Sequence, residues 1–181
     1  SKKSAGYSSP SYSGMKQTQT NQDLPVPLLY GTCKLAGNRI WQDEDATTKV
    51  KRIVAFAEGE IEGFDDIRLN DIPVAEISGI SVNRYYGTDN QVVDPIVGGN
   101  TQEERAEKVG SLRRIAYLAV DVPRSAKIDV NYNLTAVVKG RKIRVYETVR
   151  QYTTKYSENP AWVMFDFLTS YNGLGLSLIH I

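Results

Sequence analysis

Apolar residues occur along the chain in short runs that are rich in β-branched and aromatic side chains. Such runs are typical of strands, because branched and aromatic side chains pack well on a pleated surface. The pattern predicts strands over residues 49–57, 64–69, 72–77, 80–86 and 113–122. We therefore expect a mainly β body, arranged as a barrel or as a sandwich-like pair of sheets.

Two hairpins are expected where glycine lies between apolar runs. Residues 35–38 (Leu-Ala-Gly-Asn) separate the runs 28–34 and 39–42. Gly and Asn accept the positive φ that a tight reversal requires. By the same reasoning, Lys139–Arg141 is expected to connect the runs 128–138 and 142–148.

Three further connections are indicated by turn-forming residues. Gly59 and Gly63 flank Ile61 and are expected to turn the chain sharply. Asn70-Asp71 forms a second turn by the same backbone argument. Residues 87–100, rich in Gly, Asp, Asn and Pro, predict a long surface loop.

Two helices complete the α+β pattern. A short helix near 101–108 is predicted after Asn100 or Thr101, either of which can cap it, and acidic side chains follow at its positive end.

The second helix, near 160–171, has a clearer signal. Asn159 is a favourable N-cap, Pro160 suits the first helical position, and Gly173 stands where the helix should end. Its apolar residues cover more than one narrow stripe, which predicts a largely buried helix. The expected core anchors are Trp162, Phe165 and Leu168.

Local amino-acid composition divides the chain into three parts. Residues 1–22 contain few aliphatic side chains and are expected to form a flexible leader. Residues 23–176 are expected to form one β-rich region, with room for two intertwined subdomains. Residues 177–181 match no expected element, and we interpret them as a non-native or disordered end of a truncated chain.

Composition limits the classes of partner. The 181 residues include 22 basic and 21 acidic side chains, so the net charge of +1 provides no long-range field for nucleic acid or anionic lipid. Apolar runs fall far short of the roughly 20 residues of a membrane helix. We expect neither specific nucleic-acid binding nor a membrane span.

Candidate chemistry is sparse. The single histidine, His180, and the single cysteine, Cys33, cannot assemble a Ser-His-Asp or Cys-His device or a zinc site. The acidic cluster Glu58, Glu60, Glu62, Asp65 and Asp66 lacks the ligand order of a calcium loop, and a solvated turn is the favoured interpretation. We expect no enzymatic activity, no cofactor and no metal.

Two binding alternatives stay open. The basic residues 139–144 could contact a phosphate backbone, although a solvated turn is favoured. Trp41 and exposed tyrosines could stack on a carbohydrate, which would make the protein a carbohydrate-binding β-domain. A third alternative, a tail-associated cell-wall hydrolase, would depend on the acidic cluster.

Several blocks resemble the amino-terminal part of the phage tail tip attachment family, the central tail hub proteins of lambda-like phages and prophages. The matching blocks, read in order, are Pro25–Gly31, Val54–Gly63, Ile67–Val74, Val137–Val145 and Tyr156–Thr169. The segment Tyr171–Gly175 departs from the family pattern, because it lacks the Arg that often precedes Tyr-Gly.

The resemblance implies a structural protein of the virion tail tip, made in the bacterial host cytoplasm. It implies a homotrimeric hub that joins the distal tail ring and other tail-tip proteins. Regions that follow in longer family members would contact the host surface receptor. Assembly, host attachment and no catalysis are the expected roles.

Overall fold

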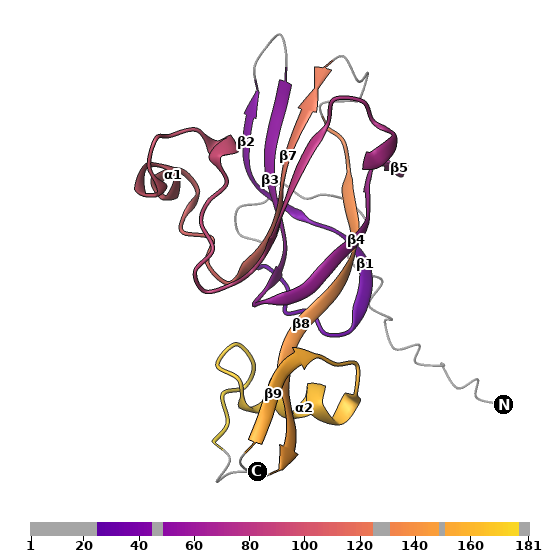
Figure 1. Cartoon of the computed structure of the whole chain (residues 1–181), viewed down its shortest axis with the longest axis vertical. Coiled ribbons are helices and arrows are strands. Elements are labelled where there is room, and N and C mark those ends of the chain that lie inside the picture. The colour runs from indigo at the N-terminus through magenta and orange to yellow at the C-terminus, as the bar shows by residue number, and fades with distance from the viewer. Residues whose placement is uncertain (1–24, 45–48, 125–130, 149–150, 178–181) are drawn as a thin grey trace, which may run out of the picture.

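A computed structural model describes residues 25–44, 49–124, 131–148 and 151–177 (Figure 1). The predicted leader and the last residues, 178–181, lie outside these ranges. The strands are β1 (Thr32–Ala36), β2 (Asn38–Glu44), β3 (Lys49–Glu58), β4 (Ile61–Leu69), β5 (Ile72–Pro73), β6 (Ser81–Tyr86), β7 (Ile115–Pro123), β8 (Leu134–Thr148) and β9 (Gln151–Tyr156). The helices are α1 (Gln102–Val109) and α2 (Pro160–Thr169), with 3-10 turns at Val74–Glu76 and Pro95–Val97.

The strands form two antiparallel sheets that pack face to face. One sheet has the order β1-β8-β4-β5, and β9 pairs with the far end of β8; the other has the order β2-β3-β7-β6. The core between them includes Leu35, Val54, Phe56, Phe64, Leu118, Leu134 and Val138. The mainly β prediction is confirmed in its sandwich form, and the described strands do not close into a barrel.

The hairpin predicted at residues 35–38 is wrong. β1 pairs with β8, whereas β2 pairs with β3, so the chain passes from one sheet to the other at Gly37. A Cβ at Gly37 would lie 2.4 Å from Val54 Cγ1 and 2.8 Å from the carbonyl oxygen of Ala55. Glycine is needed there because the crossing chain touches β3, and no reversal within one sheet is involved.

The hairpin predicted at Lys139–Arg141 is also wrong, because β8 runs unbroken from Leu134 to Thr148. The N–H of Gly140 donates to the carbonyl of Gly31 over 2.8 Å, and a Cβ there would lie 2.4 Å from the carbonyl oxygen of Leu29. This glycine again allows a close approach between two stretches of backbone. The reversal comes later, where β8 pairs with β9.

Beyond Arg141, β8 leaves the sandwich and carries a second, smaller unit (Figure 1). This unit consists of β8 from Lys142 onward, β9, and α2 with the segment that follows it to Ser177. We call it the arm. One strand therefore belongs to both the sandwich and the arm.

The predicted surface loop at 87–100 is partly buried. Val93 and Val97 lie in a second core cluster with Ile53 and Tyr117, so this segment covers one side of the sandwich. The following helix, α1, agrees with the prediction, and Thr101 Oγ1 accepts from the N–H of Glu104 over 3.2 Å.

The two glycines around Ile61 behave differently. Gly59 has φ +90° and lies between β3 and β4. Gly63 lies inside β4 and pairs with Lys139 of β8. The prediction that it forms a turn is therefore wrong. The turn is shorter than predicted because Ile61, 1% exposed, already begins the strand.

The predicted strand 72–77 shortens to Ile72–Pro73 and continues as a 3-10 turn at Val74–Glu76. The turn at Asn70–Asp71 forms with positive φ at both residues.

Candidate functional site

The arm contains most of the residues that the sequence singled out. Asn159 is the N-cap of α2, and its Oδ1 accepts from the N–H of Ala161 over 2.9 Å; Pro160 is the first helical residue. The helix ends at Thr169. Gly173 lies in the segment that turns back over the helix, where a Cβ would be 1.9 Å from the carbonyl oxygen of Phe167. Gly173 therefore allows the chain after α2 to pass close to the backbone of the helix.

The prediction that the second helix is largely buried is wrong. Asp166 is its only buried residue. The expected anchors Trp162, Phe165 and Leu168 are half-buried. The rings of Trp162 and Phe165 lie 6.0 and 5.3 Å from that of Tyr146, so one side of α2 packs on β8. On the other side of α2, Met164 and Phe167 stay exposed.

Asp166 forms one of the links between the arm and the sandwich. The Tyr30 hydroxyl donates to Asp166 Oδ2 over 2.7 Å, and Arg141 Nε lies 3.3 Å from the same oxygen in an ion pair without hydrogen-bond geometry. Burial, and then the neighbouring Asp166, raise the pKa of the Tyr30 hydroxyl. One carboxylate thus connects the amino-terminal segment, β8 and α2.

A cleft of about 530 Å³ lies where the arm meets the sandwich. Its walls come from the β3–β4 turn, the segment after β6, β8 and the arm. The charged residues that line it are Glu60, Asp89, Arg114, Arg141, Lys142, Arg144 and Asp166. We call it the neck cleft.

Ion pairs neutralise most of the charge in and beside the neck cleft. Lys142 Nζ lies 2.9 Å from Glu60 Oε1, and Lys139 Nζ lies 2.9 Å from Asp65 Oδ2. Hydrogen bonds to these carboxylates raise the pKa of both lysines. Two members of the acidic cluster, Glu60 and Asp65, therefore pair with basic residues of β8, and the basic residues lie within a strand and form no turn.

Other contacts complete the cleft. Arg114 pairs with Asp89, which raises the pKa of Arg114 and lowers that of Asp89. The guanidinium of Arg144 lies 5.0 Å from the centre of the Tyr152 ring. Asn172, in the arm, donates a hydrogen bond to Glu58 at the end of β3. The neck is thus joined chiefly by polar contacts.

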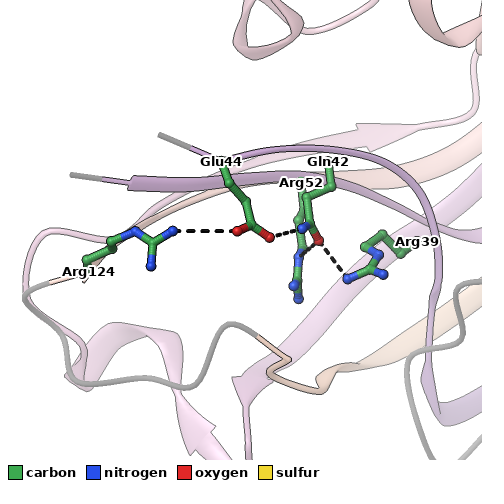
Figure 2. A network of polar contacts seen from close by, with 5 residues as sticks. All are labelled: Arg39, Gln42, Glu44, Arg52 and Arg124. Carbon is green, nitrogen blue, oxygen red and sulfur yellow. Dashed lines mark hydrogen bonds and ion pairs between the residues drawn. The ribbon is translucent and has the colours of Figure 1, made fainter. Parts of the chain in front are cut away.

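A second polar network lies inside the sandwich around Arg52, which is 1% exposed (Figure 2). Arg52 Nε donates to Gln42 Oε1 over 2.7 Å, and its Nη1 donates to the carbonyl of Tyr132 over 3.3 Å. The guanidinium also lies 4.1 Å from the centre of the Tyr132 ring. Burial lowers the pKa of Arg52, while the contact with Tyr132 opposes that shift.

The network continues outward along β2. Arg39 Nη1 donates to the same Gln42 oxygen over 2.6 Å, and the Gln42 amide donates to Glu44 (Figure 2). Glu44 Oε2 in turn lies 3.5 Å from Arg124 Nη2 in an ion pair. These contacts connect the buried Arg52 to charged side chains nearer the protein surface.

Sequence reasoning missed Arg52, Asp166 and Tyr30. Arg52 follows Lys51 and directly precedes the apolar run Ile53–Ala57 of β3, and Asp166 is the only acidic residue in the apolar helix α2. A charged residue inside an apolar element must find a partner, so Asp166 carried a usable signal, whereas Arg52 stands among the charged residues that begin β3. Tyr30 carried none.

Within the described ranges, no group of three or more His, Cys, Asp or Glu side chains is placed to hold a metal ion. Cys33 is a free, half-buried thiol. His180 lies outside the described residues. No helix in the described part of the chain is long and apolar enough to cross a membrane.

No family model matches the chain, and no curated protein matches it. A solved structure described as "Virion of native gene transfer agent (GTA) particle" contains a chain with a similar fold. The TM-score is 0.56 and the sequence identity 24%, and the match covers 71% of this chain and 29% of that chain. At this identity the likeness shows the fold alone, and this chain spans less than a third of its neighbour.

Proposed function

We propose that the protein is a non-catalytic structural subunit of a phage-like virion. The observation that carries the proposal is the similar fold of a chain in a gene transfer agent particle, over 71% of this chain. The order of the sequence blocks that resemble tail hub proteins points in the same direction. Such a role needs complementary surfaces and no reactive groups.

Within the virion, we assign the protein to the tail tip as part of a homotrimeric hub. The resemblance of Val54–Gly63 and Tyr156–Thr169 to hub proteins supports this placement. Its partners would be the distal tail ring and other tail-tip proteins, with the host receptor bound by further regions of the hub. Synthesis would take place in the host cytoplasm before assembly.

Labelling of particles tests the proposal. Antibodies against the chain should label one end of tailed particles purified from the encoding bacterium, and deletion of the gene should leave particles without a complete tip. Antibodies against a capsid protein serve as the control and should label heads. Purified particles that lack the protein would contradict the virion role, and label on the head would contradict the tail tip.

The cell-wall hydrolase alternative requires a free pair of acidic groups. Glu60 is engaged by Lys142 and Asp65 by Lys139, which disfavours that role. The purified chain should release no fragments from peptidoglycan, and Glu60→Gln with Glu62→Gln should behave identically. Turnover that the double variant abolishes would favour the hydrolase instead.

A further inference from the structure

Two of the four basic side chains that line the neck cleft are without a matching acceptor. Arg114 is paired with Asp89, and Lys142 is paired with Glu60. Within the described ranges no carboxylate pairs with Arg144, whose exposed guanidinium lies over an aromatic ring of β9. A ring face offers no oxygen lone pair, so the N–H donors of Arg144 stay open to an oxygen acceptor.

Arg141 is the second of these side chains, and it is 18% exposed. Its Nη1 lies against Gly59, where a Cβ would be 3.0 Å away. Its Nε is buried and has no acceptor among the described residues: Asp166 Oδ2, 3.3 Å away, is badly placed for a hydrogen bond and already accepts from Tyr30. A buried donor without an acceptor indicates that an ion or another polar group is missing from its surroundings.

Aromatic rings lie beside these donors. Lys142, Arg144 and Tyr146 alternate along β8, so their side chains share one face of the arm. The Phe165 ring of α2 lies 5.3 Å from that of Tyr146, and both rings line the cleft. The cleft volume of about 530 Å³ is that of a small-molecule site and far exceeds the volume of a single oxyanion. There is room for an organic group beside an anion.

The charges of the cleft favour an anion with several oxygens. Each of the three carboxylates that line it, Glu60, Asp89 and Asp166, already lies against a cation, so an incoming anion meets no free acid. A guanidinium donates through a planar fork to two oxygens at once. A phosphate ester has three terminal oxygens and can accept from both Arg141 and Arg144, whereas a carboxylate has only two.

We propose that the neck cleft binds a phosphate group carried on a small organic molecule. Arg141 and Arg144 donate hydrogen bonds to the phosphate, and Tyr146 and Phe165 lie beside the organic part. The site goes beyond the proposed virion role and does not rest on it.

Isothermal titration calorimetry of the full chain with phenyl phosphate, inorganic phosphate and phenol, at one ionic strength, tests the site. Phenyl phosphate should bind saturably and in equimolar amount, inorganic phosphate more weakly, and phenol not at all. Inorganic phosphate that binds as tightly as phenyl phosphate would overturn the assignment of the organic part to the two rings.

Variants locate the site. Arg144→Gln should weaken phenyl phosphate binding by about fivefold or more, because a charge-assisted donor is lost at an exposed position. Arg141→Lys keeps the charge without the planar fork and should weaken binding as well. The matched control is Arg84→Gln, at an exposed arginine on β6 outside the cleft, and it should bind like the parent. Circular dichroism and thermal melting establish that the variants fold.

Three outcomes would overturn the inference. A parent chain that shows no saturable binding of phenyl phosphate has no such site. Equal weakening in Arg84→Gln and Arg144→Gln would reduce the binding to general charge attraction, and parental affinity in both Arg144→Gln and Arg141→Lys would place the ligand elsewhere. None of these results affects where antibodies label the particle, so the virion role is judged separately.

Discussion

Arg52 is the residue whose environment is least expected from its chemistry. This guanidinium is 1% exposed, and Gln42 and the carbonyl of Tyr132 accept hydrogen bonds from it. Removing this buried donor takes one hydrogen bond from each of its two acceptors and opens a cavity, and both effects destabilise a core.

Replacing Arg52 should therefore lower the free energy of unfolding sharply. We expect Arg52→Ala to cost about 3 kcal/mol and Arg52→Met, which retains the volume, to cost less. Urea unfolding measures both. Arg84→Ala, at an exposed arginine on β6, is the control and should change stability by less than about 0.5 kcal/mol. Equal losses at the two arginines would show that the buried network contributes nothing.

At the scale of elements, the crossings of the chain depend on glycines that lie inside or between strands. Gly140 lets the amino-terminal segment run against β8, whereas Gly63 on β4 has open space where a Cβ would be. The two residues sit on paired strands, so they allow a matched comparison.

Gly140→Ala should destabilise the protein by about 2 kcal/mol or more, because the new methyl group would meet the carbonyl of Leu29 at 2.4 Å. Gly63→Ala should be neutral or stabilising by up to about 1 kcal/mol, since alanine loses less backbone freedom in a strand. Thermal melting of the two variants gives the comparison. A Gly140→Ala variant as stable as Gly63→Ala would rule out a tight crossing at the neck.

These same glycines mark the limit of prediction from sequence. Strand positions, the cap of α2 and the short α1 follow from local patterns of apolar and capping residues. Gly37 and Gly140 were interpreted as turns, because a turn and a close approach require the same residue. Which of the two applies depends on segments far away along the chain, such as β3 for Gly37, and periodicity carries no such information.

The neck cleft was unpredictable for a related reason. The acidic and basic clusters were both visible in the sequence, but their pairing depends on the register of β4 against β8. The exposure of α2 was not predicted either. An apolar helix predicts burial, but its sequence does not show whether the same chain or another molecule packs against it.

At the scale of the whole molecule, buried tyrosines set the response of stability to alkaline pH. Burial raises the pKa of Tyr132 to about 12, and burial also raises the pKa of Tyr117, which is fully buried. In the unfolded chain both hydroxyls ionise near their ordinary value of about 10. The folded protein then binds more protons than the unfolded one above that pH.

The contribution of these two tyrosines to the free energy of unfolding should therefore be constant below about pH 9. It should fall as the pH rises through 10 and 11. The expected slope is about 1.4 kcal/mol per pH unit for each buried tyrosine. Urea unfolding between pH 8 and pH 11 measures this slope. In the Tyr132→Phe variant the slope should be smaller by the amount expected for one buried tyrosine. An unchanged slope in that variant would show that Tyr132 ionises equally in both states.

The sharing of β8 between the sandwich and the arm has a mechanical consequence. Interstrand hydrogen bonds lie across the strand direction, and β8 is bonded to β1 on one side and β4 on the other. A pull on the arm along β8 is carried by the peptide backbone itself into both ladders, where many bonds resist in shear together. Force applied at one end of the molecule thus reaches its centre without crossing a flexible linker.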